Sequence, residues 1–310
     1  MMRAHSRVAI YFIALFAVSC GQSSGTKEKD TPTSGNICIA SDDELMSLTK
    51  AEVNVYRMLY HNAVIRPVYK PEDSAFLMLR SDSVRLIVAS RKLSPSEETY
   101  FKDRQFVPEQ VKIATDAITF IVNNNNPDIL LSVEQIKAIF AGTINNWQQL
   151  GGKQQDAISV VFDHEGSGNS RYIQQNLLNG SKFPSYCFAL HNSDEVINYV
   201  SKNVNALGVI GLNRISNVYD STVTKALANI KVVAISAKES ANAADFYQPG
   251  LESLENGQYP LCRDIYIISC EPYTGLGSGF LAFVTSNKGE RIIYREGLLP
   301  ARMPSHDLHF

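Results

Sequence analysis

Residues 116–142 read DAITFIVNNNNPDILLSVEQIKAIFAG, and this short segment contains a strand, a turn and a capped helix. The β-branched run Ala117–Val122 predicts a strand, and the asparagine run that ends at Pro127 predicts a turn. Ser132 and Gln135 then form a capping box ahead of apolar residues at helical spacing, and Gly142 is a suitable stop. A strand that leads into a helix is the basic unit of an α/β chain.

The same alternation continues on both sides of this segment. On the N-terminal side, Ser94-Pro95-Ser96-Glu97 is a second capping box, with proline at the first helical position. Two strands, near Phe106–Ile113 and Ala117–Val122, are predicted to follow almost back to back. The pattern favours an α/β fold, with further strands predicted at Ile37–Ala40, Val64–Tyr69, Val84–Ala89, Ile158–Phe162, Leu207–Leu212, Ile230–Ile235 and Asp264–Ser269.

Length and composition exclude several classes of protein. The chain has 310 residues, of which 45% are hydrophobic and 19% charged, as expected for one large or two smaller globular domains. Its 29 basic and 31 acidic residues give a net charge of -2 and form no basic block. A nucleic acid is therefore not expected as a partner.

The first residues have the pattern of an export signal. Arg3 and Arg7 precede the apolar run Val8–Val18, which is too short to cross a hydrocarbon core of about 30 Å. The segment resembles a bacterial lipoprotein signal peptide, which implies removal of residues 1–19 and a lipid on Cys20; plain secretion with loss of Cys20 is the alternative. Residues 20–35 are predicted to be a flexible tether. We therefore expect an exported protein, anchored by lipid to the bacterial cell envelope in the periplasm or at the cell surface.

Four further cysteines follow: Cys38, Cys187, Cys262 and Cys270. Cys262 and Cys270 lie on one predicted strand and would be about 26 Å apart, too far for a disulfide. We expect the four thiols to be buried and to act as small apolar residues.

The turn Glu165-Gly166-Ser167-Gly168-Asn169-Ser170-Arg171 lies between a predicted strand and a predicted helix. Glycines allow close approach of a ligand, and free N–H groups at a helix start attract anions. A plain helix cap explains the same residues. The six histidines lack metal-ligand spacing, and no nucleophile triad can be assembled, so no metal, cofactor or catalytic residue is predicted.

Residues 116–142 together with Ile144-Asn145-Asn146-Trp147, Gly166-Ser167-Gly168, Leu207–Gly211 and Tyr259–Arg263 resemble the phosphate-type solute-binding proteins of bacterial ABC importers. The similarity runs in the family's order from about Ile37 to Ala301. It implies a two-lobe type II periplasmic-binding-protein fold, each lobe a mixed β-sheet flanked by helices. Residues 36–115 and 231–310 would form lobe 1 and residues 116–230 lobe 2, with hinges near Thr115-Asp116 and Ile230-Lys231.

The resemblance further implies a monomeric, non-catalytic protein that holds a small oxyanion, phosphate in most of the family, between its lobes and delivers it to an ABC permease. Carried over by position, the ligand-binding residues come from four loops: Ser41, Asp42, Asp43, Ser74, Ser90, Arg91, Ser167, Gly168, Asn169, Ser170 and Arg171.

Acidic residues depart from the family's pattern. Asp42, Asp43 and Glu44 occupy a loop that is usually rich in glycine, serine and threonine, Glu72-Asp73 replaces a Gly-Ser turn, and Asp163 stands where many members have arginine. A carboxylate about 4 Å from a phosphate dianion costs several kcal/mol at an effective dielectric of about 20. Either these acids cap helices and face away, or the ligand is an organic anion, a zwitterion or a peptide. A surface hydrolase is a further alternative.

Overall fold

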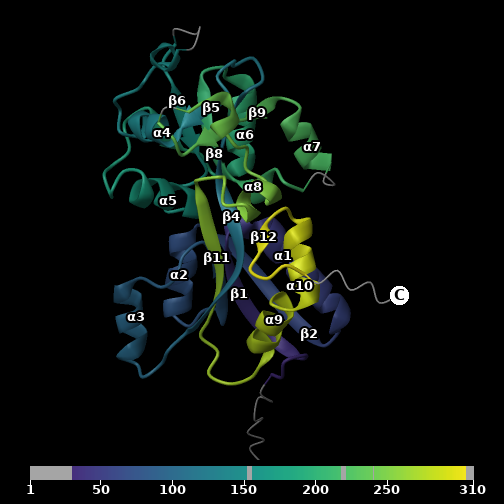
Figure 1. The fold of residues 1–310 in the computed structure, drawn as a ribbon. Helices are drawn as coiled ribbons and strands as arrows, with labels where there is room; N and C mark the ends of the chain where they lie inside the picture. Colours follow the sequence, from purple (N-terminus) through teal and green to yellow (C-terminus); the bar gives the residue numbers. More distant parts are fainter. Residues whose placement is uncertain (1–29, 152–155, 218–220, 240, 305–310) are drawn as a thin grey trace, which may run out of the picture.

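The computed structural model describes residues 30–151, 156–217, 221–239 and 241–304. The predicted signal peptide, Cys20 and the first part of the tether lie outside these residues. The described chain forms two α/β lobes stacked end to end, with two long strands running between them (Figure 1).

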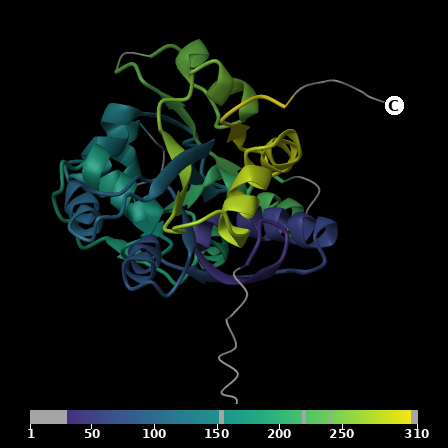
Figure 2. The same ribbon diagram turned by 90° about the horizontal axis from the view of Figure 1, so that it is seen from below.

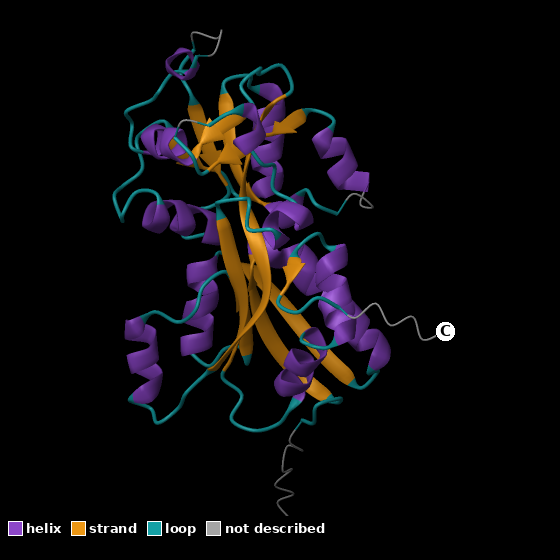
Figure 3. Cartoon of the chain, in the orientation of Figure 1, coloured by secondary structure: helices purple, strands orange, loops and turns teal. Residues whose placement is uncertain are grey.

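Lobe 1 is built on a sheet with the strand order β2-β1-β3-β11-β4. The first three strands are parallel, and β11 runs antiparallel to its neighbours. Helices flank this sheet (Figure 3). Its elements are β1 (Gly35–Asp42), α1 (Met46–Leu59), β2 (Ala63–Lys70), α2 (Glu72–Arg80), β3 (Leu86–Ala89), α3 (Pro95–Lys102), β11 (Cys262–Ser269), α9 (Leu276–Val284), α10 (Asn287–Arg295) and β12 (Leu299–Pro300).

Strand β4 (Glu109–Asn123) joins the two lobes. Its first half pairs with β11 as far as Ala117, and its second half, from Ile118, pairs with β8 (Ala206–Gly211). The sequence predicted two strands here, and that prediction is wrong because the backbone stays extended across Thr115-Asp116. The predicted first hinge therefore lies in the middle of one strand.

Lobe 2 continues the sheet through β8 and surrounds it with helices. Figure 2 shows the molecule from the lobe 1 end, with the yellow-green strand β11 near the middle of the view. The remaining elements are β5 (Leu130–Ser132), α4 (Val133–Phe140), β6 (Ser159–Phe162), α5 (Gly168–Asn176), β7 (Cys187–Ala189), α6 (Ser193–Lys202), α7 (Ser221–Leu227), β9 (Ile230–Val232), β10 (Ala234–Ser236) and α8 (Leu251–Glu255), with 3-10 turns at η1 (Asp43–Leu45), η2 (Trp147–Leu150), η3 (Leu212–Arg214) and η4 (Ala243–Asp245).

Both predicted capping boxes are confirmed. Ser94 accepts a hydrogen bond from the backbone of Glu97, whose side chain accepts one in return, at the start of α3. Ser132 and Gln135 make the same pair of bonds at the start of α4. Each box satisfies backbone donors that a helix start leaves free.

Residues 231–261 pack with lobe 2. Strand β9 pairs with the second half of β4, and β10 pairs with β5. Val233, Ile235 and Leu261 belong to the apolar core of lobe 2. The predicted strand Ile230–Ile235 is thus two short strands on different partners, and we propose that the second crossing lies at Leu261-Cys262 rather than at Ile230-Lys231.

The end of the predicted tether is part of lobe 1. Thr31 and Ser34 form a small bridge, and the hydroxyl of Tyr56 on α1 donates to the carbonyl of Pro32. The cysteines Cys38, Cys187, Cys262 and Cys270 are free and only half-buried, less buried than predicted. Within the described residues, no helix combines the length and the apolar character needed to span a bilayer.

Glu52 on α1 predicts a pH effect on the stability of lobe 1. Its carboxyl oxygens are buried without a hydrogen-bond partner among the described residues, and burial together with Glu296 raises its pKa to about 9. The folded chain therefore binds this proton more tightly than the unfolded chain, so stability falls as pH rises from about 4.5 towards 9. We expect the free energy of unfolding of Glu52→Gln, measured by urea denaturation, to match that of the wild type at pH 5. At pH 8 it should exceed that of the wild type by about 2 kcal/mol or more. Equal pH profiles for the two proteins would contradict this assignment.

Candidate functional site

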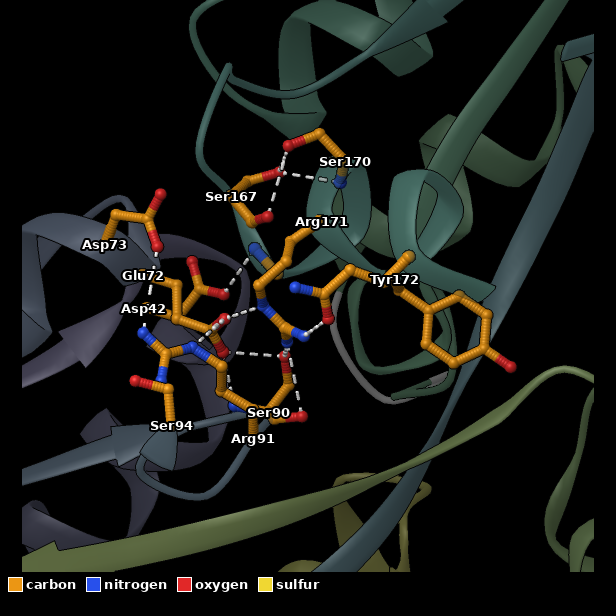
Figure 4. Close-up of polar contacts among 12 residues, drawn as sticks. Asp42, Glu72, Asp73, Ser90, Arg91, Ser94, Ser167, Ser170, Arg171 and Tyr172 are labelled. Carbon is orange, nitrogen blue, oxygen red and sulfur yellow. Dashed lines mark hydrogen bonds and ion pairs between the residues drawn. The ribbon is translucent and has the colours of Figure 1, made fainter. Parts of the chain in front are cut away.

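Polar and charged side chains meet where the two lobes touch, at the ends of β1, β3 and β6 and at the starts of α2 and α5 (Figure 4). We call this set the interlobe cluster. It comprises Asp42, Glu44, Glu72, Ser90, Asp116, Asp163, Ser167, Gly168, Arg171 and Arg263, and most of these residues are buried.

The start of α5 is the contribution of lobe 2. Gly166 has φ +78°, which turns the chain from β6 into the helix, and Ser167 caps the helix by accepting from the N–H of Ser170. The hydroxyl of Ser167 donates to Asp163 at 2.7 Å. The next amide, that of Gly168, donates across the lobe boundary to Oδ2 of Asp42 at 3.1 Å. A carboxylate of lobe 1 therefore occupies the first free amide of a lobe 2 helix.

Glu72 forms a second contact between the lobes. Its carboxylate accepts from the N–H and the hydroxyl of Ser90, at 2.6 and 2.7 Å, and from Nε of Arg171 on α5 at 2.5 Å. Arg171 also donates to the hydroxyl of Ser90 at 3.0 Å (Figure 4). Arg91 is directed mainly to Glu97, at 2.7 Å, with its guanidinium over the ring of Phe76.

Glu44 forms a third contact. Its Oε2 accepts from the amide of Gly211, at the end of β8, at 2.8 Å, and its Oε1 accepts from the hydroxyl of Ser193 at the start of α6. Glu44 thus takes two donors of lobe 2, although it belongs to lobe 1.

Arg263 on β11 lies next to the contact between Asp42 and Gly168. It is paired in register with Asp116 on β4, whose Oδ2 accepts from Nε at 3.0 Å and from Nη2 at 2.8 Å. Its third nitrogen, Nη1, is buried without a hydrogen-bond partner in the described part of the chain. The cluster therefore contains a buried guanidinium with a free donor.

The acidic groups of the cluster differ in their protonation. Burial raises the pKa of Asp42 well above its ordinary value, with help from Glu72 and Asp163, and burial together with Asp163 raises that of Glu44 to about 8. Burial also raises the pKa of Asp163. Glu72 is equally buried, yet the Arg171 guanidinium and the donors of Ser90 outweigh burial and lower its pKa. Glu72 is therefore a fixed anion, whereas the other three hold protons more readily.

Two cavities open on either side of the cluster. One, of about 230 Å³, is acidic: Asp42, Asp43, Glu44, Asp163 and Asp194 line it, beside Arg214. The other, of about 610 Å³, is basic, because Arg91, Lys92 and Arg171 line it beside the single acid Asp73. Both cavities have walls from both lobes.

The structure brings most of the predicted ligand-binding residues together. Asp42, Ser90, Ser167, Gly168 and Arg171 meet in the cluster, Asn169 and Ser170 follow on the first turn of α5, and Asp43 and Arg91 line the two cavities. Ser41 is buried elsewhere, since its hydroxyl bonds to Thr49 of lobe 1. At the start of α2, Glu72 and Asp73 rather than Ser74 contact lobe 2.

The acids do not face away from the interlobe contact. Asp42 caps the short turn η1 of its own lobe through the N–H of Glu44, and its other oxygen caps the start of α5 in the opposite lobe. The role of Arg263 and its partner Asp116 was not predicted. The sequence signal was a basic residue next to a predicted apolar strand, which suggests a buried ion pair. The contact of Ser193 with Glu44 was not predicted either.

Comparison with known proteins agrees with this architecture. A family model described as a PBP superfamily domain matches residues 26–288. The phosphate-binding protein PstS of Pseudomonas aeruginosa is 26% identical over 289 residues, covering 88% of this chain and 85% of that protein. PstS of Staphylococcus aureus is 24% identical over 207 residues, covering 65% of this chain and 59% of that protein.

Solved structures show the same fold. A substrate-binding protein with bound phosphate from Clostridium perfringens superposes with a TM-score of 0.72 at 23% identity, covering 86% of this chain and all of that one. An ABC-type phosphate transport receptor from Vibrio cholerae gives a TM-score of 0.66 at 20% identity, with the same coverage of this chain. The predicted two-lobe type II periplasmic-binding-protein fold is confirmed.

Proposed function

Because this chain belongs to the PBP superfamily, we propose that it is a non-catalytic solute-binding protein that captures a small oxyanion, phosphate first among them, between its two lobes. The relatives named as phosphate-binding proteins support the choice of ligand. Most of the predicted ligand-binding residues lie at the contact between the lobes, which supports the choice of site.

One observation carries the proposal. Three backbone amides at the lobe contact, those of Ser90, Gly168 and Gly211, each donate to a carboxylate oxygen. A carboxylate is itself an oxyanion, so the environment of these amides is one that accommodates an oxyanion. Amides that donate to carboxylate oxygens are equally suited to donate to phosphate oxygens.

Capture follows from the position of these donors in both lobes. Gly168 and Arg171 belong to lobe 2, whereas Ser90 and Arg263 belong to lobe 1. An oxyanion that touches both sets binds the closed form more tightly than the open form and shifts the population towards closure. The closed form would then deliver the ligand to an ABC permease. We propose that a lipid on Cys20 holds the monomeric protein at the cell envelope.

Calorimetry tests this proposal directly. The protein that begins after residue 19 is unfolded and refolded to remove bound solute, and phosphate is then titrated into it at pH 7. We expect saturable binding with one phosphate per chain, and a control with Lys50→Ala, an exposed position on α1, should bind alike. A folded protein that binds no phosphate would contradict the choice of ligand.

A zwitterion is a second candidate ligand. The acidic cavity beside Asp42 suits an ammonium group, and the basic cavity beside Arg171 suits a carboxylate. A thermal-shift panel of phosphate, sulfate and amino acids separates the two classes, since only the true ligand should raise the melting temperature at low concentration. A chromogenic phosphate ester, offered with and without divalent metal, tests the hydrolase alternative.

A further inference from the structure

The carboxylate of Asp42 occupies a position that an external oxyanion needs. Its Oδ2 takes the amide of Gly168 on α5, although Asp42 lies at the end of β1 in the other lobe. The same oxygen, the hydroxyl of Ser90 and Nη1 of Arg263 all converge on Gly168, because each lies within 3.0 Å of the position that a Cβ atom would take there. Asp42 therefore fills the point where the donors of both lobes meet.

Asp42 differs from Glu72 in how well its charge is compensated. Glu72 accepts two hydrogen bonds from Ser90 and one from Arg171. Asp42 accepts the bond from Gly168 and a long one, at 3.5 Å, from the N–H of Glu44, and none of its bonds comes from a guanidinium. Glu72 is a structural ion of the closed form, whereas Asp42 is a weakly held acceptor that another oxyanion could replace.

The surroundings of Asp42 also contain unused donors. Nη1 of Arg263 and Nδ2 of Asn169, the residue after Gly168, are buried without partners among the described residues. Buried donors of this kind are rare in folded proteins and call for an acceptor. An oxyanion with four oxygens offers more acceptor positions than the two oxygens of one carboxylate.

We propose that Asp42 limits the affinity of the interlobe site, where its carboxylate acts as a built-in competitor of the oxyanion for the amide of Gly168. This inference rests on the proposed function and adds to it the sign of the effect that Asp42 has on affinity. The competitor lowers the affinity for every oxyanion, and its removal opens the amide without disturbing Glu72 and Arg171.

The test compares Asp42→Ser and Asp42→Asn with the wild type by calorimetric titration of phosphate and, separately, of sulfate at pH 7.5. We expect both variants to bind both anions about tenfold more tightly or better, with the larger gain for serine, which vacates the position. The matched control is Glu165→Gln, which removes an exposed negative charge three residues before Gly168 and should change affinity less than about twofold. Circular dichroism verifies that each variant is folded.

Three results would overturn the inference. If Asp42→Asn weakens phosphate binding while sulfate binding improves, Asp42 accepts a proton of phosphate and is a ligand contact, not a competitor. If Glu165→Gln gives the same gain, the effect is long-range electrostatics. If the wild type binds and the variants gain nothing, the inference fails alone, whereas a complete lack of oxyanion binding by all folded proteins overturns the proposed function as well.

Discussion

Gly168→Val is expected to weaken oxyanion binding at least about a hundredfold while leaving both lobes folded. A Cβ atom at this position would lie 2.5 Å from Oγ of Ser90, 2.6 Å from Oδ2 of Asp42 and 3.0 Å from Nη1 of Arg263. All three neighbours belong to lobe 1, whereas Gly168 begins a helix of lobe 2. The new side chain therefore acts as a wedge between the lobes and leaves the apolar core of each lobe unchanged.

Two measurements check this expectation. Calorimetry should show the loss of binding, and small-angle scattering should show a larger radius of gyration than the wild type in the presence of ligand. Gly250→Val is the matched control, because nothing lies within 4 Å of a Cβ atom there and its φ of 179° is ordinary extended backbone. Unchanged binding and an unchanged radius in Gly168→Val would show that α5 does not face lobe 1 in solution.

The features that the sequence predicted correctly are those fixed by near neighbours. The capping boxes at Ser94 and Ser132 join residues three positions apart, so they form wherever the helix forms. The turn at Gly166 was recognisable for the same reason, since a positive φ next to a capping serine is a local requirement. Strand β4 was divided in two because polar residues at Thr115 and Asp116 interrupt its apolar run.

The rest of the site depends on contacts that no local pattern contains. Glu44 meets Ser193 and Gly211, which are 149 and 167 positions away in the chain. Arg263 reaches Asp116 only because β4 and β11 run side by side between the lobes. The acids could be identified as unusual from the sequence, but whether they faced the contact or solvent depended on the packing of the two lobes.

Arg263→Met is expected to destabilise the protein by about 3–5 kcal/mol at pH 8, the usual cost of breaking a buried ion pair on one side. The guanidinium of Arg263 and the carboxylate of Asp116 are 2% and 0% exposed, so the substitution leaves a buried carboxylate without its cation. It also removes a positive charge that lowers the pKa values of the buried carboxyls of Asp42 and Glu44. The double variant Arg263→Met/Asp116→Asn should recover part of the loss, because the orphaned charge is then absent.

The loss should also depend on pH in a definite direction. Arg263 lowers the pKa values of Asp42, Glu44 and Asp163, against burial, which raises them. Without Arg263 these pKa values rise further in the folded form, so stability falls more steeply with increasing pH and the deficit is larger at pH 8 than at pH 5. Urea denaturation at both pH values measures this difference in stability.

The control is Lys112→Met, which breaks the half-exposed pair with Asp264 on the same two strands and should cost at most about 1 kcal/mol. A small, pH-independent loss of stability for Arg263→Met, equal to that of the control, would mean that the guanidinium does not compensate the negative charge of the cluster.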